Sequence, residues 1–280
     1  MSSETTLLVD GLMFPETPRW HDGKLWFSDM VGRKVMTVDL SGKTEVIVEV
    51  PKGPSGLGWL PDGRLLVVSI TDRRLMRLDP DGLNVAADLS DLATFNCNDM
   101  VVDGQGRAYV GNFGYDALGG KPFAPATLIL VTPDGKARII AEDMAFPNGT
   151  VITPDGKTLI VGESRGSCLT AFDIESDGSL SHRRVWAQLE KGHMPDGTCL
   201  DAEGAVWVTS PGKGEVLRVH EGGTISRIIK GMKPAFACML GGTDRRTLFL
   251  CTAISAESFR GKASGQIEQI QVDVPGAGWP

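Results

Sequence analysis

The chain has 280 residues with a formal net charge of −7, and it contains 35 Gly and 16 Pro. The acidic balance argues against nucleic acid or an anionic membrane surface as a partner, because both require a basic face. The Gly and Pro content predicts many short strands joined by tight turns and argues against a helical protein.

The start of the chain and its cysteines indicate a cytoplasmic protein. Residues 1–6 contain no cationic segment followed by an apolar one, so we expect no secretory signal. No apolar run approaches the ~20 residues that span a bilayer. The cysteines are odd in number and scattered without a Cys-x-x-Cys pair, which is typical of reduced thiols rather than of disulfides or a zinc site.

An internal repeat predicts the fold class. A short loop followed by two apolar strands recurs about every 40 to 50 residues, which is the length of a propeller blade. We align the loop of the six copies at Glu16, Ser55, Asn98, Asn148, Asp196 and Ala235. The second strand of each copy is predicted around residues 25–27, 65–68, 108–110, 159–161, 206–208 and 248–250.

Further strands complete most copies. Third strands are predicted at residues 35–39, 75–79, 128–131, 169–173 and 216–219, and fourth strands at 45–48, 137–140, 184–186 and 226–229. The sixth copy ends near Val272, one strand short, and residues 6–12 resemble a fourth strand. We therefore predict an all-β, six-bladed β-propeller with four antiparallel strands per blade, formed by residues 1–280 as a single domain and closed by the N-terminal strand.

The longest insertion is residues 112–126 in the third repeat. Long loops in compact domains are usually functional or disordered. Phe113, Tyr115 and Phe123 either form the roof of an apolar pocket or pack the loop onto the propeller, and the sequence does not distinguish the two.

Four of the aligned loop positions carry hard oxygen ligands. Equivalent positions in different blades form a ring around the propeller axis, so Glu16, Asn98, Asn148 and Asp196 are predicted to meet there. Two carboxylates and two amides suit Ca²⁺ or Mg²⁺, and a cation removes the repulsion between the two acids. Alternatively, Asn or Asp before Gly is an ordinary turn residue, although Glu16 has no such local use.

At these positions the chain resembles the SMP-30/gluconolactonase/LRE-like family of calcium-dependent propellers. The resemblance rests on Pro15-Glu16-Thr17-Pro18, on Asn98 and the residues that follow it, on Pro147-Asn148-Gly149 and on Pro195-Asp196-Gly197. It implies that Glu16, Asn148 and Asp196 bind a divalent metal, most often Ca²⁺, with Mg²⁺, Mn²⁺ and Zn²⁺ as alternatives. It also implies that Asn98 is a ligand or a substrate contact and that Asp196 is the general base.

Two departures from the family pattern bear on the substrate. Asn96 stands where sugar lactonases of the family often have Arg, and Met100 replaces the Gly of a frequent Asn-Asp-Gly. We expect a lactone less polar than an aldonolactone, or a small ester. The predicted substrate contacts are Asn96, Asn98, Met100, Phe113, Tyr115 and His193.

The predicted activity is metal-dependent opening of a lactone by a monomer or weak homodimer. The cation would polarise the carbonyl, and Asp196 would take the proton of the attacking water. Whether Asp196 or the cation itself activates that water stays open. A phosphotriester hydrolase on the same platform and a non-catalytic interaction scaffold are the alternatives.

Overall fold

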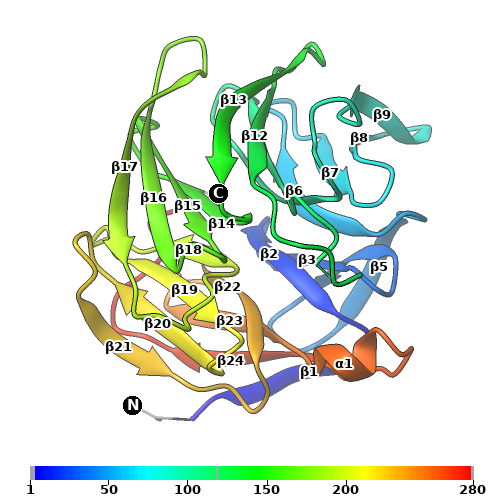
Figure 1. Ribbon diagram of the computed structural model, residues 1–280. Coiled ribbons are helices and arrows are strands. Elements are labelled where there is room, and N and C mark those ends of the chain that lie inside the picture. The colour runs from blue at the N-terminus through cyan, green and yellow to red at the C-terminus, as the bar shows by residue number, and fades with distance from the viewer. Residues whose placement is uncertain (1–3, 118, 279–280) are drawn as a thin grey trace.

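The computed structural model describes residues 4–117 and 119–278, so Leu118 of the insertion lies outside the described residues. Within them, the strands form six antiparallel four-stranded sheets arranged in a ring (Figure 1). The six-bladed propeller predicted from the repeats is confirmed. Blade 1 consists of β2–β5, blade 2 of β6–β9, blade 3 of β10–β13, blade 4 of β14–β17, blade 5 of β18–β21, and blade 6 of β22–β24 with β1.

The first strand of each blade contacts the first strands of the two neighbouring blades, which closes a ring around the axis. These inner strands are β2 (Pro15–His21), β6 (Pro54–Trp59), β10 (Cys97–Val102), β14 (Pro147–Ile152), β18 (Thr198–Leu200) and β22 (Ala235–Gly241). The second strands are β3 (Lys24–Asp29), β7 (Leu65–Ser69), β11 (Ala108–Asn112), β15 (Thr158–Glu163), β19 (Val206–Ser210) and β23 (Thr247–Thr252).

The remaining strands form the outer half of each blade. The third strands are β4 (Lys34–Val38), β8 (Arg74–Asp79), β12 (Ala126–Val131), β16 (Cys168–Ile174), β20 (Glu215–Val219) and β24 (Gly265–Gln271). The fourth strands are β5 (Thr44–Glu49), β9 (Gly82–Asp88), β13 (Ala137–Met144), β17 (Leu180–Gln188), β21 (Ile225–Ile229) and β1 (Thr6–Leu12).

The burial of a strand depends on its position in the blade. Second strands such as β7, β11 and β19 are buried at every residue, because both of their faces pack against neighbouring blades. The sequences of such strands are continuous apolar runs. Fourth strands such as β5 expose most of their residues, and their sequences are correspondingly more polar.

The N-terminal strand closes the ring. β1 pairs antiparallel with β24, and Figure 1 shows them side by side. The Thr5 hydroxyl donates a 2.6 Å hydrogen bond to the buried Glu268 carboxylate. The predicted closure is therefore confirmed. A short helix, α1 (Ser255–Ser258), in the β23–β24 connection was not predicted from the sequence.

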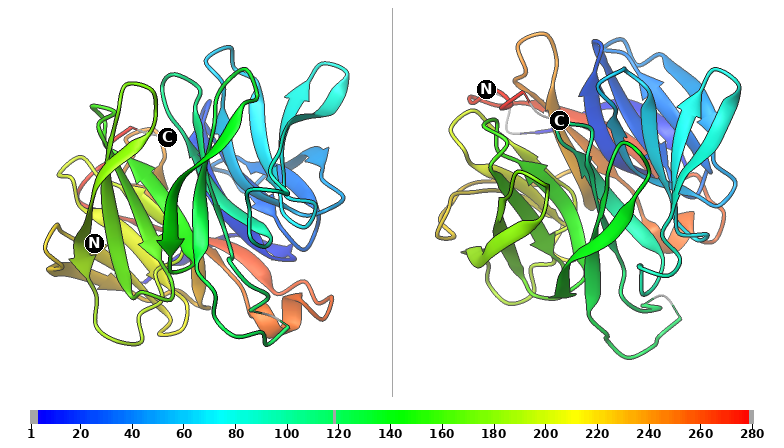
Figure 2. Two further views of the ribbon diagram at one scale, coloured as in Figure 1. Left: turned by 45° about the horizontal axis from the view of Figure 1, so that its top comes forward. Right: turned by 90° about the horizontal axis from the view of Figure 1, so that it is seen from above.

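Strand direction determines which loops share a face. Inner strands begin, and second strands end, at one face of the ring, so the connections after β11 and β23 lie there together with the predicted ligands. Figure 2 shows the β11–β12 loop and α1 on the same side of the ring. We call this the ligand face. None of the helices in the described residues is long and apolar enough to cross a membrane.

Candidate metal centre

Three of the predicted ligands lie where the inner strand departs from regular pairing. The ladders to the second strands change register between Glu16 and Arg19, between Cys97 and Met100, and between Pro147 and Thr150. β-bulges re-aim side chains and are frequent beside active sites. The same shift occurs between Pro54 and Leu57 and between Ala235 and Ala237, so it is a feature of the repeat that directs strand residues away from the regular ladder.

Backbone strain adjoins two of these positions. Thr17 has φ 44° and Phe146 has φ 65°, which are left-handed values that β-branched and bulky residues rarely adopt. The Thr17 hydroxyl holds the strained turn by donating to the Ser55 carbonyl at 2.8 Å. Strain of this kind persists only where the surroundings enforce it and clusters at functional sites.

The two carboxylates are close enough to affect each other. Burial, and next the charge of Asp196, raise the pKa of Glu16 well above its ordinary value. Burial, and next the charge of Asp99, raise the pKa of Asp196 to about 8, while a hydrogen bond from Asn148 acts in the opposite direction. Glu16 and Asp196 therefore belong to one poorly solvated acidic site.

The two amides keep their oxygens available. Asn98 donates its Nδ2 to the Pro147 carbonyl at 3.3 Å, and Asn148 donates its Nδ2 to the Ser164 hydroxyl at 3.2 Å. Both side chains are buried, with 9% of each residue exposed. Within the described residues, neither Oδ1 accepts a protein hydrogen bond. The chain thus fixes both amides through their nitrogens and leaves the oxygens for another group.

A buried ion pair with Arg19 compensates the charge of a third acid, Asp99. Arg19 Nη2 donates to Asp99 Oδ1 at 3.0 Å and to the Met100 carbonyl at 2.6 Å. Arg19 Nε is buried without a partner among the described atoms. Because Arg19 neutralises Asp99, two carboxylate charges remain for a dication. The sequence analysis missed this pair, since nothing in the repeat connects positions 19 and 99.

Glycines allow the inner strands to approach each other. The Gly149 amide donates to the Asp196 carbonyl at 3.0 Å, and a Cβ on Gly149 would collide with that carbonyl and with the Thr198 amide. The Gly after Asn148 therefore permits β14 to lie against the Asp196 loop. Gly149 lies within β14 and does not form the turn that the alternative interpretation of Asn148-Gly149 predicts.

A second set of polar residues supports the ligand-bearing segments. Asp29 accepts the amides of Phe14 at 2.8 Å and Met13 at 3.1 Å, just before Glu16. Glu163 accepts the Ala145 amide at 2.6 Å, just before Asn148. In the described chain every second strand ends in a buried polar residue, namely Asp29, Ser69, Asn112, Glu163, Ser210 and Thr252. Aligning the six repeats at this position would have revealed the pattern in the sequence.

The donor set fits a hard divalent cation. The described residues contain no group of three or more His, Cys, Asp or Glu arranged to hold a metal, so a site here depends on the amides as well as on Glu16 and Asp196. Carboxylate and amide oxygens are ligands that Ca²⁺ accepts readily. The unpartnered oxygens of Asn98 and Asn148 are free to bind such a cation. The charge of Asp196, which helps to raise the pKa of Glu16, would be offset by it.

Two predicted substrate contacts lie in buried positions. Met100 is 0% exposed and packs in the core between blades 2 and 3, below Gly56, so it does not border the mouth. His193 is 3% exposed, and its Nδ1 lies 3.2 Å from the Ser210 Oγ, which also accepts the Met194 amide. Burial lowers the pKa of His193. Its position indicates support of the Asp196 loop.

The insertion carries an aromatic cluster on the ligand face. Phe113 stacks on Phe146 with ring centroids 4.9 Å apart, and Tyr115 meets Phe146 edge-on at 6.3 Å. The Phe113 amide donates to the Asn96 carbonyl at 2.9 Å. Phe113 therefore packs the loop down, while Tyr115 and Phe123 line a recess. The half-buried Asn96 stays a predicted substrate contact.

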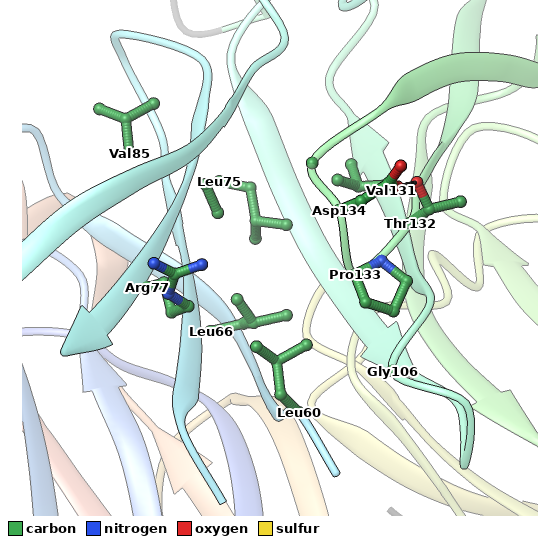
Figure 3. Close-up of a pocket in the computed structure, with 12 residues that line it drawn as sticks. Leu60, Leu66, Leu75, Arg77, Val85, Gly106, Val131, Thr132, Pro133 and Asp134 are labelled. Carbon is green, nitrogen blue, oxygen red and sulfur yellow. Dashed lines mark hydrogen bonds between the residues drawn. The ribbon is translucent and has the colours of Figure 1, made fainter. Parts of the chain in front are cut away.

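A different recess opens at the opposite face of the ring, between blades 2 and 3 (Figure 3). It has a volume of about 200 Å³ and is lined by the turn that contains Gly106 and by residues 131–135. These turns follow β10 and β12 and so lie at the far ends of the strands. This recess is not part of the candidate metal centre.

The fold and the axial site define a six-bladed propeller with an oxygen-rich centre at one end of the axis. A model of the "SMP-30/Gluconolactonase/LRE-like region" matches residues 14–254. The chain belongs to this family.

Similar proteins include regucalcin of Danio rerio, 27% identical over 253 residues that cover 85% of this chain and 82% of the relative. A solved gluconolactonase of Xanthomonas campestris matches at 25% identity with a TM-score of 0.74, covering 96% of this chain and 89% of the other. A luciferin-regenerating enzyme shares the fold with a TM-score of 0.83 at 20% identity, covering 98% and 96% of the two chains.

Proposed function

We propose that the chain is a divalent-cation-dependent hydrolase that opens a lactone or a small ester. The observation that carries the proposal is the donor set of Glu16, Asn98, Asn148 and Asp196, in which the charge of one half-buried acid acts on the other and the two amides have their nitrogens engaged by the protein. Membership of a family named for gluconolactonase, and similarity to a solved gluconolactonase, support the lactone as the substrate class.

The same four side chains would hold the cation, for which Ca²⁺ is the first choice and Mg²⁺, Mn²⁺ and Zn²⁺ are alternatives. When bound, a divalent cation supplies Lewis acidity that polarises a carbonyl. The positions of Asn98 and Asn148 are fixed by their contacts with Pro147 and Ser164, which pre-organises the site before substrate arrives.

Asp196 is the proposed general base. Burial raises the pKa of this carboxyl and makes it a stronger proton acceptor than an aspartate in water. A bound cation opposes that rise by favouring the carboxylate form. Asp196 would take the proton of the attacking water, while Arg19 keeps the adjacent Asp99 charge compensated.

A pH-indicator screen of lactones and small esters on wild type, chelated wild type and Asp196→Asn tests the proposal. We expect turnover that chelator removes and that Asp196→Asn lowers by about 100-fold or more. Equal rates for wild type and Asp196→Asn would remove Asp196 from the mechanism. A phosphotriester in the same screen tests the alternative hydrolase activity.

A further inference from the structure

A recess on the ligand face lies beside the candidate metal centre. Its volume is about 430 Å³, within the ~300–1,000 Å³ typical of small-molecule sites. Blade 3 contributes most of the wall through the β11–β12 loop, and blade 4 contributes one residue from the β15–β16 turn. We call it the insertion recess, and its lining residues are Tyr115, Ala117, Gly120, Lys121, Phe123 and Arg165.

Short connections link this recess to a predicted ligand. Tyr115 contacts Phe146, which precedes Asn148 by two residues. The Arg165 amide donates to the Ala145 carbonyl at 2.9 Å. The neighbouring Ser164 accepts from Asn148 and donates to the Pro195 carbonyl at 2.6 Å. A substrate bound with its carbonyl at the metal centre would therefore have its substituents close to the recess.

The recess carries two cations without carboxylate partners. In the part of the chain that the structure describes, neither Lys121 nor Arg165 forms an ion pair or a side-chain hydrogen bond. The Arg165 guanidinium lies 6.0 Å from the Tyr115 ring centroid instead. The insertion's own acid, Asp116, does not line the recess and accepts the Gly119 amide at 2.7 Å.

Aromatic surface accompanies these charges. Phe123 meets Tyr115 edge-on with centroids 5.6 Å apart and is 54% exposed. The exposed Phe123 ring offers apolar contact to a flat or aliphatic group, and the two cations favour an anion through charge-assisted hydrogen bonds. We propose that the insertion recess binds a carboxylate carried on an apolar or aromatic substituent of the substrate. The role of this group as a substituent rests on the proposed hydrolase function.

Binding can be measured without turnover. In ¹⁹F NMR with chelator present, the probe 4-fluorophenylacetate should bind the full chain, and its neutral amide should bind more weakly. Arg165→Gln and Lys121→Gln should each weaken binding of the anion by about three- to five-fold, as expected for exposed charge pairs. Arg260→Gln is the matched control, because Arg260 is an exposed arginine beside α1, on the same face. Unchanged binding in Arg165→Gln, or an equal loss in Arg260→Gln, would overturn the proposal.

A kinetic comparison separates this proposal from the proposed function. For lactones that carry a carboxymethyl group and for the corresponding primary amides, the kcat/KM ratio of anion to amide should fall about three- to five-fold in Arg165→Gln. If lactones are turned over but the anion-to-amide ratio of kcat/KM is the same in Arg165→Gln as in wild type, the recess is not a substrate subsite. The proposed hydrolase function would then still hold. Absence of turnover on every lactone, with the NMR result as expected, would reject the hydrolase and retain the anion site.

Discussion

At the scale of single residues, the candidate centre places two acids in half-buried, poorly solvated positions. Glu16 and Asp196 come from blades that are distant along the chain, yet the charge of Asp196 helps to raise the pKa of Glu16. Only Asp99 among the nearby acids has a buried cationic partner within the described residues, namely Arg19. Without a cation, ionised Glu16 and Asp196 therefore destabilise the fold, and this cost can be measured.

Glu16→Gln should stabilise the protein in the presence of chelator. The substitution removes a half-buried acid and its repulsion with Asp196, so we expect the free energy of unfolding at pH 8 to rise by about 1–3 kcal/mol. The same variant should lose the increase in unfolding temperature that calcium gives to wild type. Glu221→Gln, at an exposed turn position, is the control and should change neither quantity. A less stable Glu16→Gln that calcium still stabilises would contradict the site.

The pKa of Asp196 predicts how stability depends on pH. Because the pKa is raised from 3.8 to about 8, folded protein retains a proton that the unfolded chain has already released between these values. The stability of chelated protein should therefore fall as pH rises from about 4 to about 8. Calcium binding displaces this proton, so its stabilising effect should grow over the same range. Melting curves with calcium or chelator from pH 5 to 9 test this, and a calcium effect independent of pH would be evidence against it.

At the scale of elements, the ends of the second strands control the segments that carry the ligands. Asp29 binds the two amides that precede Pro15-Glu16, and Glu163 binds the amide two residues before Pro147-Asn148. The Ser210 hydroxyl likewise accepts the Met194 amide, just before Pro195-Asp196. In blades 1, 4 and 5, the segment that leads to the predicted ligand is thus held by the second strand of the same blade.

Asp29→Asn tests whether this support positions Glu16. The amide group can replace only one of the two accepting oxygens, so an amide donor of Met13 or Phe14 loses its partner, at a cost of about 1–3 kcal/mol in stability. A positioning role also predicts calcium binding weaker by about 10-fold, measured by calorimetry. Asp39→Asn, in an exposed turn, should leave the calcium affinity unchanged. Lower stability with unchanged affinity would make Asp29 structural only.

The sequence predicted what the repeat displays and missed what departs from it. Second strands were predictable because continuous apolar runs mark strands that are buried on both faces. The ligand positions followed from aligning loops across repeats. The strained Thr17 has no local sequence signature, since a tertiary contact, the bond from its hydroxyl to the Ser55 carbonyl, holds it. Met100 was predicted to contact substrate from its place in the motif, whereas its side chain lies in the core between blades 2 and 3.

At the scale of the whole molecule, closure of the ring keeps distant ligands together. Inner strands of blades 1, 3, 4 and 5 supply the four side chains or the loop that carries them, and they belong to a ring in which each of the six inner strands contacts its two neighbours. β1 covers the outer edge of β24, and Thr5 and Thr252 both donate to Glu268. The sequence predicted this arrangement, because the last repeat lacked one strand and the N-terminal segment resembled it.

Removal of residues 1–11 should open blade 6. We expect the unfolding temperature to fall by about 10 °C, since the exposed edge of β24 loses its pairing strand and Glu268 loses a donor. A synthetic peptide of residues 4–12 added in excess should restore part of the loss. An unchanged unfolding temperature would show that β1 contributes nothing to ring stability.

Anomalous diffraction from a crystal grown with Mn²⁺ tests most directly whether the four side chains share a cation. We predict one strong peak within coordination distance of Glu16, Asn148 and Asp196, with Asn98 beside it, and loss of that peak in Glu16→Gln. A structure with no peak there, or with manganese bound only at other carboxylates, would contradict the metal centre on which the proposed function depends.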